Sequence, residues 1–189
     1  MLRKFLVFIF VGILAVFSSS YGEDDYYYAG SLEGETGIKL SALFINYTDI
    51  EGSRKSIKIT DFLSMYGYIG SRINPTLSVG ASVEMGAGAY MSEGYGYFYN
   101  PFEINALINL KPARNLRFYA GAGMSFNNLK ESSISRTKPR LALGVQFSIG
   151  GKVNISPALG ILAEYKGRMF FGEDTVIHGL AIGVYLLAR

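Results

Sequence analysis

A strict alternation over residues 76–91, TLSVGASVEMGAGAYM, limits what this chain can fold into more than any other feature. Every second residue is apolar, and the residues between them are small, polar or, at Glu84, charged. Successive side chains of a β-strand point to opposite faces of the sheet. The stretch therefore predicts one unusually long strand with a purely apolar face.

The same period of two recurs in seven further segments, which predicts an all-β chain of eight strands. These segments are 37–44, 61–73, 102–111, 116–126, 140–150, 158–171 and 176–189. Short turns are expected near Asn74, Pro112 and Gly151. Longer, more polar connections are expected at 49–56, 92–101, 127–138 and 172–175. Short connections at one end and longer ones at the other are typical of a membrane barrel.

A soluble β-sandwich also alternates, but two properties favour a membrane. The segments run to about 10–14 residues, whereas globular strands have about 5–6 and tilted membrane-spanning strands about 9–11. The non-apolar positions hold mostly glycine and tyrosine, and only 17% of the chain is charged, against about 25% in soluble domains. We therefore expect an eight-stranded antiparallel up-and-down transmembrane β-barrel. It must close, because no unpaired backbone amide can face hydrocarbon.

The alternation also assigns the two faces of this barrel. The apolar positions are expected to face lipid, and they include Leu77, Val79, Val83, Met85, Leu141, Leu143, Val145, Phe147, Leu159 and Ile161. In the lumen an ion-pair network is expected among Arg72, Glu84, Glu103, Arg117, Arg140, Glu164, Lys166 and Arg168. Unpaired charges in a narrow lumen are costly, so this network is expected to plug the barrel.

The N-terminus has the order of a secretory signal peptide. Arg3 and Lys4 precede an apolar run of 13 residues, 5–17, which is shorter than the ~20 residues of a spanning helix. We expect cleavage after Gly22, with a cut after Ser19 or Ser20 as the alternative. We then expect three parts: a signal peptide 1–22, a lead-in 23–34 and a membrane barrel 35–189.

Composition excludes several classes of function. The chain has no cysteine, which removes disulfides, thiolate metal sites and a cysteine nucleophile. A net charge of +3 without a Lys/Arg run gives little support for nucleic-acid binding. One histidine and scattered acids form no metal-ligand cluster. The Gly-x-Gly pairs lie inside expected strands, so they are not dinucleotide loops, and no cofactor is expected.

Two groups of residues deserve a chemical hypothesis. His178, with Asp174 beside the same loop, is the one candidate catalytic base, although a rim histidine without a catalytic role is preferred. Glu103 and Glu164 are interpreted as counter-ions of the inward cations rather than as an acid–base pair.

The run YGYFY, 95–99, is interpreted as part of an interfacial aromatic girdle, with an adhesive loop tip as the alternative.

With these features the chain resembles the small OmpA/OmpX-like outer-membrane β-barrels of Gram-negative-type bacteria. The resemblance covers 35–189 and is carried by NPTLSVGASVEMG, GGKVNISPALGILAEYKGRMFF and the ending HGLAIGVYL. It implies outer-membrane lipid and lipopolysaccharide as surroundings and the barrel-insertion machinery as a partner. Family members usually end in an aromatic residue, most often Phe, whereas this chain ends in Leu187, Ala188 and Arg189.

Three functional hypotheses follow. The first is a monomeric, non-enzymatic outer-membrane protein that acts in envelope structure, or in adhesion to a host or surface ligand through short extracellular loops. The second is a secreted lipocalin-like carrier of a hydrophobic ligand, which the charged inner face and the absence of Trp disfavour. The third is a lipid A-modifying enzyme with His178 as the candidate base, an activity that the resemblance to outer-membrane barrels implies. Basic residues near loop ends either meet lipopolysaccharide phosphates or are simply solvated; they are Arg54, Lys55, Lys58, Arg136, Lys138 and Arg140.

Overall fold

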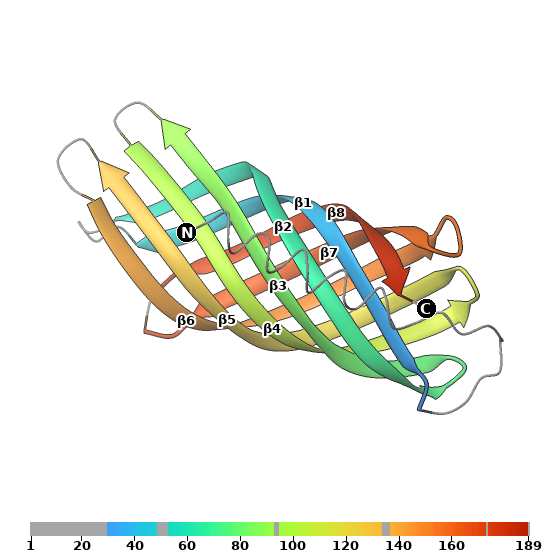
Figure 1. Ribbon diagram of the computed structural model, residues 1–189. Helices are drawn as coiled ribbons and strands as arrows, with labels where there is room; N and C mark the ends of the chain where they lie inside the picture. Colours follow the sequence, from blue (N-terminus) through green and yellow to red (C-terminus); the bar gives the residue numbers. More distant parts are fainter. Residues whose placement is uncertain (1–29, 49–52, 93–94, 134–136, 173, 189) are drawn as a thin grey trace, which may run out of the picture.

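Antiparallel pairing joins each strand to the next in the computed structural model, and the last strand pairs with the first (Figure 1). The structure describes residues 30–48, 53–92, 95–133, 137–172 and 174–188. The eight strands are β1 (Leu32–Thr48), β2 (Arg54–Asn74), β3 (Leu77–Ser92), β4 (Tyr95–Ala113), β5 (Leu116–Ser133), β6 (Thr137–Asn154), β7 (Leu159–Phe170) and β8 (Val176–Ala188). The predicted eight-stranded antiparallel up-and-down barrel is confirmed.

The N-terminal assignments lie mostly outside this range. The predicted signal peptide 1–22 is not among the described residues, and the predicted lead-in 23–34 is described only from residue 30. Strand β1 begins at Leu32, so the last three residues of that lead-in already belong to the barrel wall. In the described part of the chain, no helix is long and apolar enough to span a membrane.

The two ends of the barrel differ. Three tight turns join β2–β3, β4–β5 and β6–β7 at the end where β1 begins and β8 finishes, and we call this the turn end. The first turn is closed by the Asn74 carboxamide oxygen, which accepts hydrogen bonds from the backbone N–H of Thr76 and Leu77, both at 2.9 Å. The opposite end, which holds the other four connections, is the loop end.

An apolar band surrounds the middle of the barrel. On β5 the outward side chains are apolar from Phe118 to Phe126, and the next outward residues toward the loop end are the exposed Asn128 and Lys130. The structure places all ten residues predicted to contact lipid on the outer surface. Eight of them are exposed, while Leu77 and Met85 are half-exposed. A band of this height matches the ~9–11 residues with which a tilted strand crosses hydrocarbon.

The strands continue well beyond this band, and two of the predicted connections are wrong. The stretch 92–101 lies almost entirely in β3 and β4, and 127–138 lies almost entirely in β5 and β6. The outward positions there become polar, at Asn100 and Asn128 for example, which ends the apolar alternation. Backbone pairing does not depend on that polarity, so the ladder continues where the hydrophobic signal stops.

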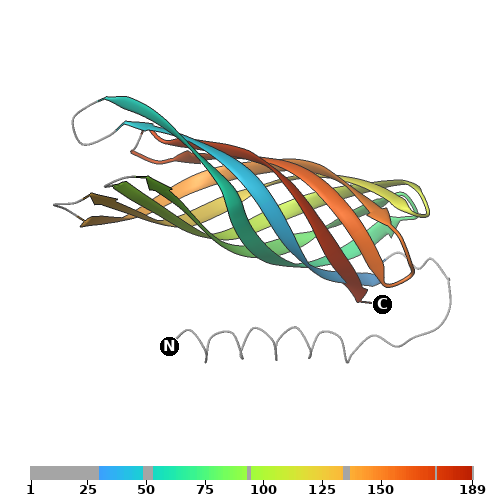
Figure 2. The ribbon, with the colours of Figure 1, turned by 90° about the horizontal axis from the view of Figure 1, so that it is seen from above.

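Above the band the barrel wall divides in two (Figure 2). Pairing between β2 and β3 ends at Leu63 and Ala87, and pairing between β6 and β7 ends at Gly144 and Phe170. The register between β1 and β2 shifts nearby, where a bulge bends β2. The loop end therefore carries two extensions, one of β1–β2, with β8 paired to β1 as far as Asn46, and one of β3–β6, and the two diverge in Figure 2.

Glycines inside the barrel are needed where two elements approach closely. A Cβ added at Gly80 would lie 2.3 Å from the carbonyl oxygen of Ile69, and one at Gly123 would lie 2.0 Å from that of Ile104. Backbone cannot move aside as a side-chain end can. Gly151 is different, because the nearest atom to an added Cβ there is in the Phe118 ring at 3.5 Å, an ordinary contact.

We therefore expect Gly123→Ala and Gly80→Ala each to destabilise the folded barrel by about 1–3 kcal/mol, the usual cost of overpacking. Gly151→Ala is the matched control and should change stability by less than about 0.5 kcal/mol. Urea titration of folding into phospholipid vesicles, followed by heat-modifiable migration on a denaturing gel, measures the difference. Equal stability of the three variants would show that these glycines are not sterically required.

Candidate functional site

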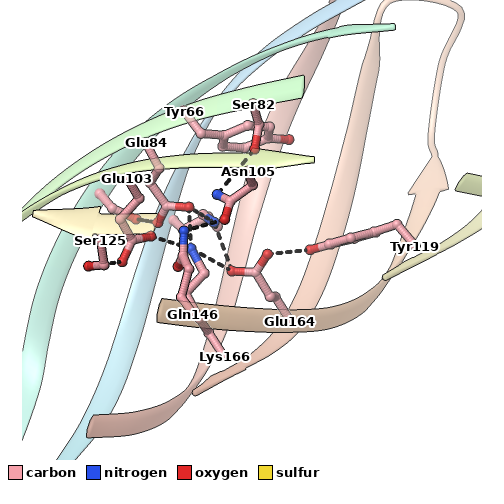
Figure 3. Close-up of polar contacts among 12 residues, drawn as sticks. Tyr66, Ser82, Glu84, Glu103, Asn105, Tyr119, Ser125, Gln146, Glu164 and Lys166 are labelled. Atoms are coloured by element: carbon pink, nitrogen blue, oxygen red, sulfur yellow. Dashed lines mark hydrogen bonds and ion pairs between the residues drawn. The ribbon is translucent and has the colours of Figure 1, made fainter. Parts of the chain in front are cut away.

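Three carboxylates and three cations meet in the middle of the lumen, and we call this set the central network (Figure 3). It consists of Glu84, Glu103, Glu164, Lys39, Lys166 and Arg168, so the formal charges balance. The Lys166 Nζ lies 2.8 Å from Glu103 and 3.5 Å from Glu164, and the Lys39 Nζ lies 2.8 Å from Glu164. Lys39 also pairs with Glu84, and Arg168 with Glu103.

Neutral donors occupy the remaining carboxylate positions. The Ser64 hydroxyl donates to Glu84 at 2.7 Å, and the Tyr119 hydroxyl donates to Glu164 at 2.8 Å. The Gln146 amide lies between Asn105 and Glu103. All six charged groups are buried, and a buried ion pair is tolerated only when such hydrogen bonds complete it.

A second ionic group lies toward the turn end, and it was largely missed from the sequence. Glu35 pairs with Lys152 and, at 2.9 Å, with Arg117, while Glu33 pairs with Arg72 and Lys111 near the rim. Glu33 and Glu35 share the inward parity of β1 with Lys39, and this parity is the sequence signal for their position.

Lys152 occupies a cage of four tyrosine rings. Its Nζ lies 4.7 Å from the ring centroid of Tyr119, 5.2 Å from that of Tyr66, and 5.6 Å from those of Tyr68 and Tyr185. Such distances are those of cation–π contacts. The tyrosines lie directly over glycines; a Cβ at Gly160, for example, would be 2.2 Å from the Tyr185 ring. These inward-facing glycines thus leave the space that the neighbouring tyrosine rings occupy in the lumen.

The loop end of the lumen is closed by an apolar cluster rather than by charges. Its buried members are Leu43, Ile45, Tyr47, Ile59, Phe62, Tyr97, Tyr99, Leu129, Ala142, Phe170 and Ile177. The rings of Tyr47 and Tyr97, and those of Phe62 and Tyr99, are 5.6 Å apart. The girdle and adhesive-tip interpretations of 95–99 are therefore wrong for Tyr97 and Tyr99, which point inward because the strand extends past the membrane band.

Of the eight residues predicted for the lumen network, the structure brings five into the central network: Glu84, Glu103, Glu164, Lys166 and Arg168. Arg117 lies in the turn-end group, and Arg72 is at the rim with 33% of its side chain exposed. The side chain of Arg140 lies outside the described part of the structure. Lys39 and Lys152 were not selected, although Lys39 stood on the inward parity of the segment 37–44.

The central network borders a space of about 10 Å³ for the centre of a water molecule, enough for about one water. Glu103 and Glu164 are both bonded to cations, which agrees with their interpretation as counter-ions. His178 faces outward on β8, away from the lumen, with its ring stacked on Phe44. Among the described residues no cluster of metal-ligating side chains is present.

A closed barrel with apolar side chains outside and charges inside is the architecture of a protein that crosses a membrane with strands. It is the reverse of a carrier barrel, which needs an apolar interior for its ligand. The model of the outer membrane protein β-barrel domain family matches residues 9–186 of this chain. The chain therefore belongs to that family and is a protein of the bacterial outer membrane, as the resemblance implied.

Solved structures agree with this fold. The chain is similar to Ail of Yersinia pestis, with a TM-score of 0.58 and 15% identity over 82% of this chain and 99% of that one. It is also similar to Neisserial surface protein A, with a TM-score of 0.55 and 15% identity over 80% and 96% of the two chains. For OprG of Pseudomonas aeruginosa the TM-score is 0.52, with 9% identity over 85% and 97%. The comparison with curated proteins gives no match.

We expect Glu103→Gln to destabilise the barrel by about 3–5 kcal/mol, because it leaves Lys166 and Arg168 with too little negative charge in a dry interior. The double variant Glu103→Gln/Arg168→Met restores the balance and should recover part of that loss. Urea titration in phospholipid vesicles measures both. A single variant as stable as the wild type would mean that the central network contributes no stability.

Proposed function

We propose that the protein is a non-enzymatic outer-membrane barrel with a plugged lumen, which acts in envelope structure or surface interaction through its loop end. One observation supports the plugged lumen: inward side chains of three kinds succeed one another along the barrel axis. The turn-end ionic group and tyrosine cage, the central network and the apolar cluster follow one another from one end to the other. In this proposal the ten apolar residues named above contact lipid, and the inward charges form part of the plug.

The proposal also includes the export of the chain, its insertion into the membrane and its orientation there. Residues 1–22 act as a cleaved signal peptide, residues that follow them form a short periplasmic lead-in, and the barrel-insertion machinery places the barrel in the membrane as a monomer. The loop end then faces the cell exterior, because the tight turns of such barrels lie on the periplasmic side.

The two extensions at the loop end support a surface role. Each ends the pairing with its neighbour and so leaves a strand edge above the membrane band. Natural sheets protect such edges with charges, bulges or proline. The β2 edge carries Lys58 and a bulge, and the β6 edge carries Pro139, whereas the β3 edge beyond Ala87 has neither a charge nor a proline. An extended peptide can therefore add to the β3 edge as a further strand.

A relative in fold suggests one ligand to include in a test. Ail of Yersinia pestis, to which this chain is similar with 16% identity and a TM-score of 0.57, has been crystallised with the heparin analogue sucrose octasulfate. Heparin is therefore a reasonable probe beside protein ligands, since Arg54, Lys58 and Lys130 are exposed near the loop end.

For the plug, we expect no large, stable ohmic channel from the purified protein in planar bilayers, because ions would have to cross an apolar cluster and a neutralised ionic network. An open porin reconstituted in the same bilayers is the positive control. Reproducible steps of porin size from this protein alone would contradict the plugged lumen.

For the loop end, we expect a deletion strain to lose binding of cells to immobilised serum proteins, matrix proteins or heparin. The variant Ala89→Lys/Met91→Lys places two charges at the exposed β3 edge. When it complements the deletion strain, we expect detergent resistance equal to that of the wild type, but no recovery of protein binding. Loss of detergent resistance in the deletion strain alone would assign the envelope role instead. A deletion strain normal in both assays would contradict the proposal.

A further inference from the structure

A row of outward side chains crosses five adjacent strands on one wall of the barrel. Phe147 on β6 is paired with Gly167 on β7, and Gly167 is paired with His178 on β8. His178 in turn is paired with Phe44 on β1, and Phe44 with Lys58 on β2. Direct cross-strand partners on one face are close enough to touch, so this register builds a continuous surface feature.

The rings of this row are in contact. The Phe44 and His178 centroids are 5.4 Å apart with an angle of 19° between the rings, a stacked arrangement. The ring centroid of Tyr165 lies 6.3 Å from that of His178 and 6.2 Å from that of Phe147. A Cβ at Gly167 would be 2.3 Å from the Phe147 ring, so that ring lies flat across the β7 backbone. We call Phe44, Phe147, Tyr165 and His178 the aromatic row.

The row descends from polar to apolar surroundings. At its upper end the Lys58 Nζ sits 5.5 Å from the centroid of the Phe44 ring, and the outward neighbours Asn46 and Arg54 are exposed and polar. At its lower end Phe147 is 48% exposed within the apolar band. The row thus offers a cation at the depth of lipid headgroups and a line of exposed rings below it at the depth of acyl chains.

We propose that the aromatic row and Lys58 bind an anionic, phosphate-bearing lipid of the leaflet at the loop end. The phosphate pairs with the Lys58 ammonium, and an acyl chain lies along Phe44, Tyr165 and Phe147. The His178 imidazole N–H, between those two regions, donates to a phosphate or ester oxygen. Charge complementarity and depth select a lipid, because the rings lie where the surrounding solvent is hydrocarbon. The inference does not depend on the surface role proposed for the extensions.

The absence of Trp from the chain makes a direct test available. Leu180 is exposed beside the row, directly opposite Tyr165, so Leu180→Trp places a single fluorophore there without altering the row. The protein is refolded into vesicles that contain either brominated phosphatidylglycerol or brominated phosphatidylcholine. The two quenching curves give the relative binding constant of the anionic lipid at this site.

We expect the anionic lipid to be preferred about fivefold at Leu180→Trp, which is the ~1 kcal/mol of one lysine at a lipid surface. Adding Lys58→Gln should reduce the ratio of the two binding constants to about one, so that no preference remains. Adding Phe44→Leu should lower the ratio in part. Heat-modifiable migration shows that each variant is folded.

A second reporter separates a built site from general attraction of anionic lipid. Met124→Trp lies on β5 beside the Phe102–Phe126 ring pair, with Lys130 further along the same strand. Lys130 is not held over that pair, so we expect almost no preference there. The same preference at both reporters, or an unchanged preference after Lys58→Gln, would overturn the proposed lipid site.

Discussion

A strand that crosses hydrocarbon has no water to satisfy its backbone N–H and C=O groups, so each strand must pair on both sides. Eight strands meet this condition only by closing, and the β1–β8 pairing does so here. Closure at eight strands leaves an interior just wide enough for side chains. The glycines, the tyrosines that lie over them and the paired charges are all consequences of that narrow space. Gly80 and Gly123 lie so close to neighbouring backbone that an added Cβ would overlap a carbonyl oxygen.

The same narrow space makes charge balance a condition of folding. Glu84, Glu103 and Glu164 are each bonded to at least two cationic or hydroxyl donors, so no carboxylate of the central network is left uncompensated. Toward the loop end, where the wall is no longer in the membrane band, the interior becomes apolar instead. The lumen therefore changes from ionic to hydrophobic along its axis.

Closure restricts the side chains that fit the interior, whereas it places no such restriction on the outer surface. The wall of β7–β8 and β1–β2 carries the aromatic row on its outer surface, while the β3–β6 extension carries an edge nearer the loop end. These two surfaces differ in depth and in chemistry. One offers a cation with a line of aromatic rings below it, and the other offers a strand edge that ends its pairing beyond the apolar band.

Much of this followed from the alternation of side chains. The period of two, set by the geometry of a strand, gave the number of strands, their antiparallel order and the face on which Val79, Glu84 or Ile161 lies. It predicts loops in place of the β4 and β5 extensions, because the outward residues turn polar there. It also could not show which inward charges meet, because pairing depends on the stagger between strands and not on parity. Sequence by itself thus determined the two faces of each strand. Only the closed barrel decided that Lys39 on β1 reaches Glu164 on β7, that four tyrosines surround Lys152, and that Phe44 stacks on His178. Each contact joins residues whose distance is set by register and closure.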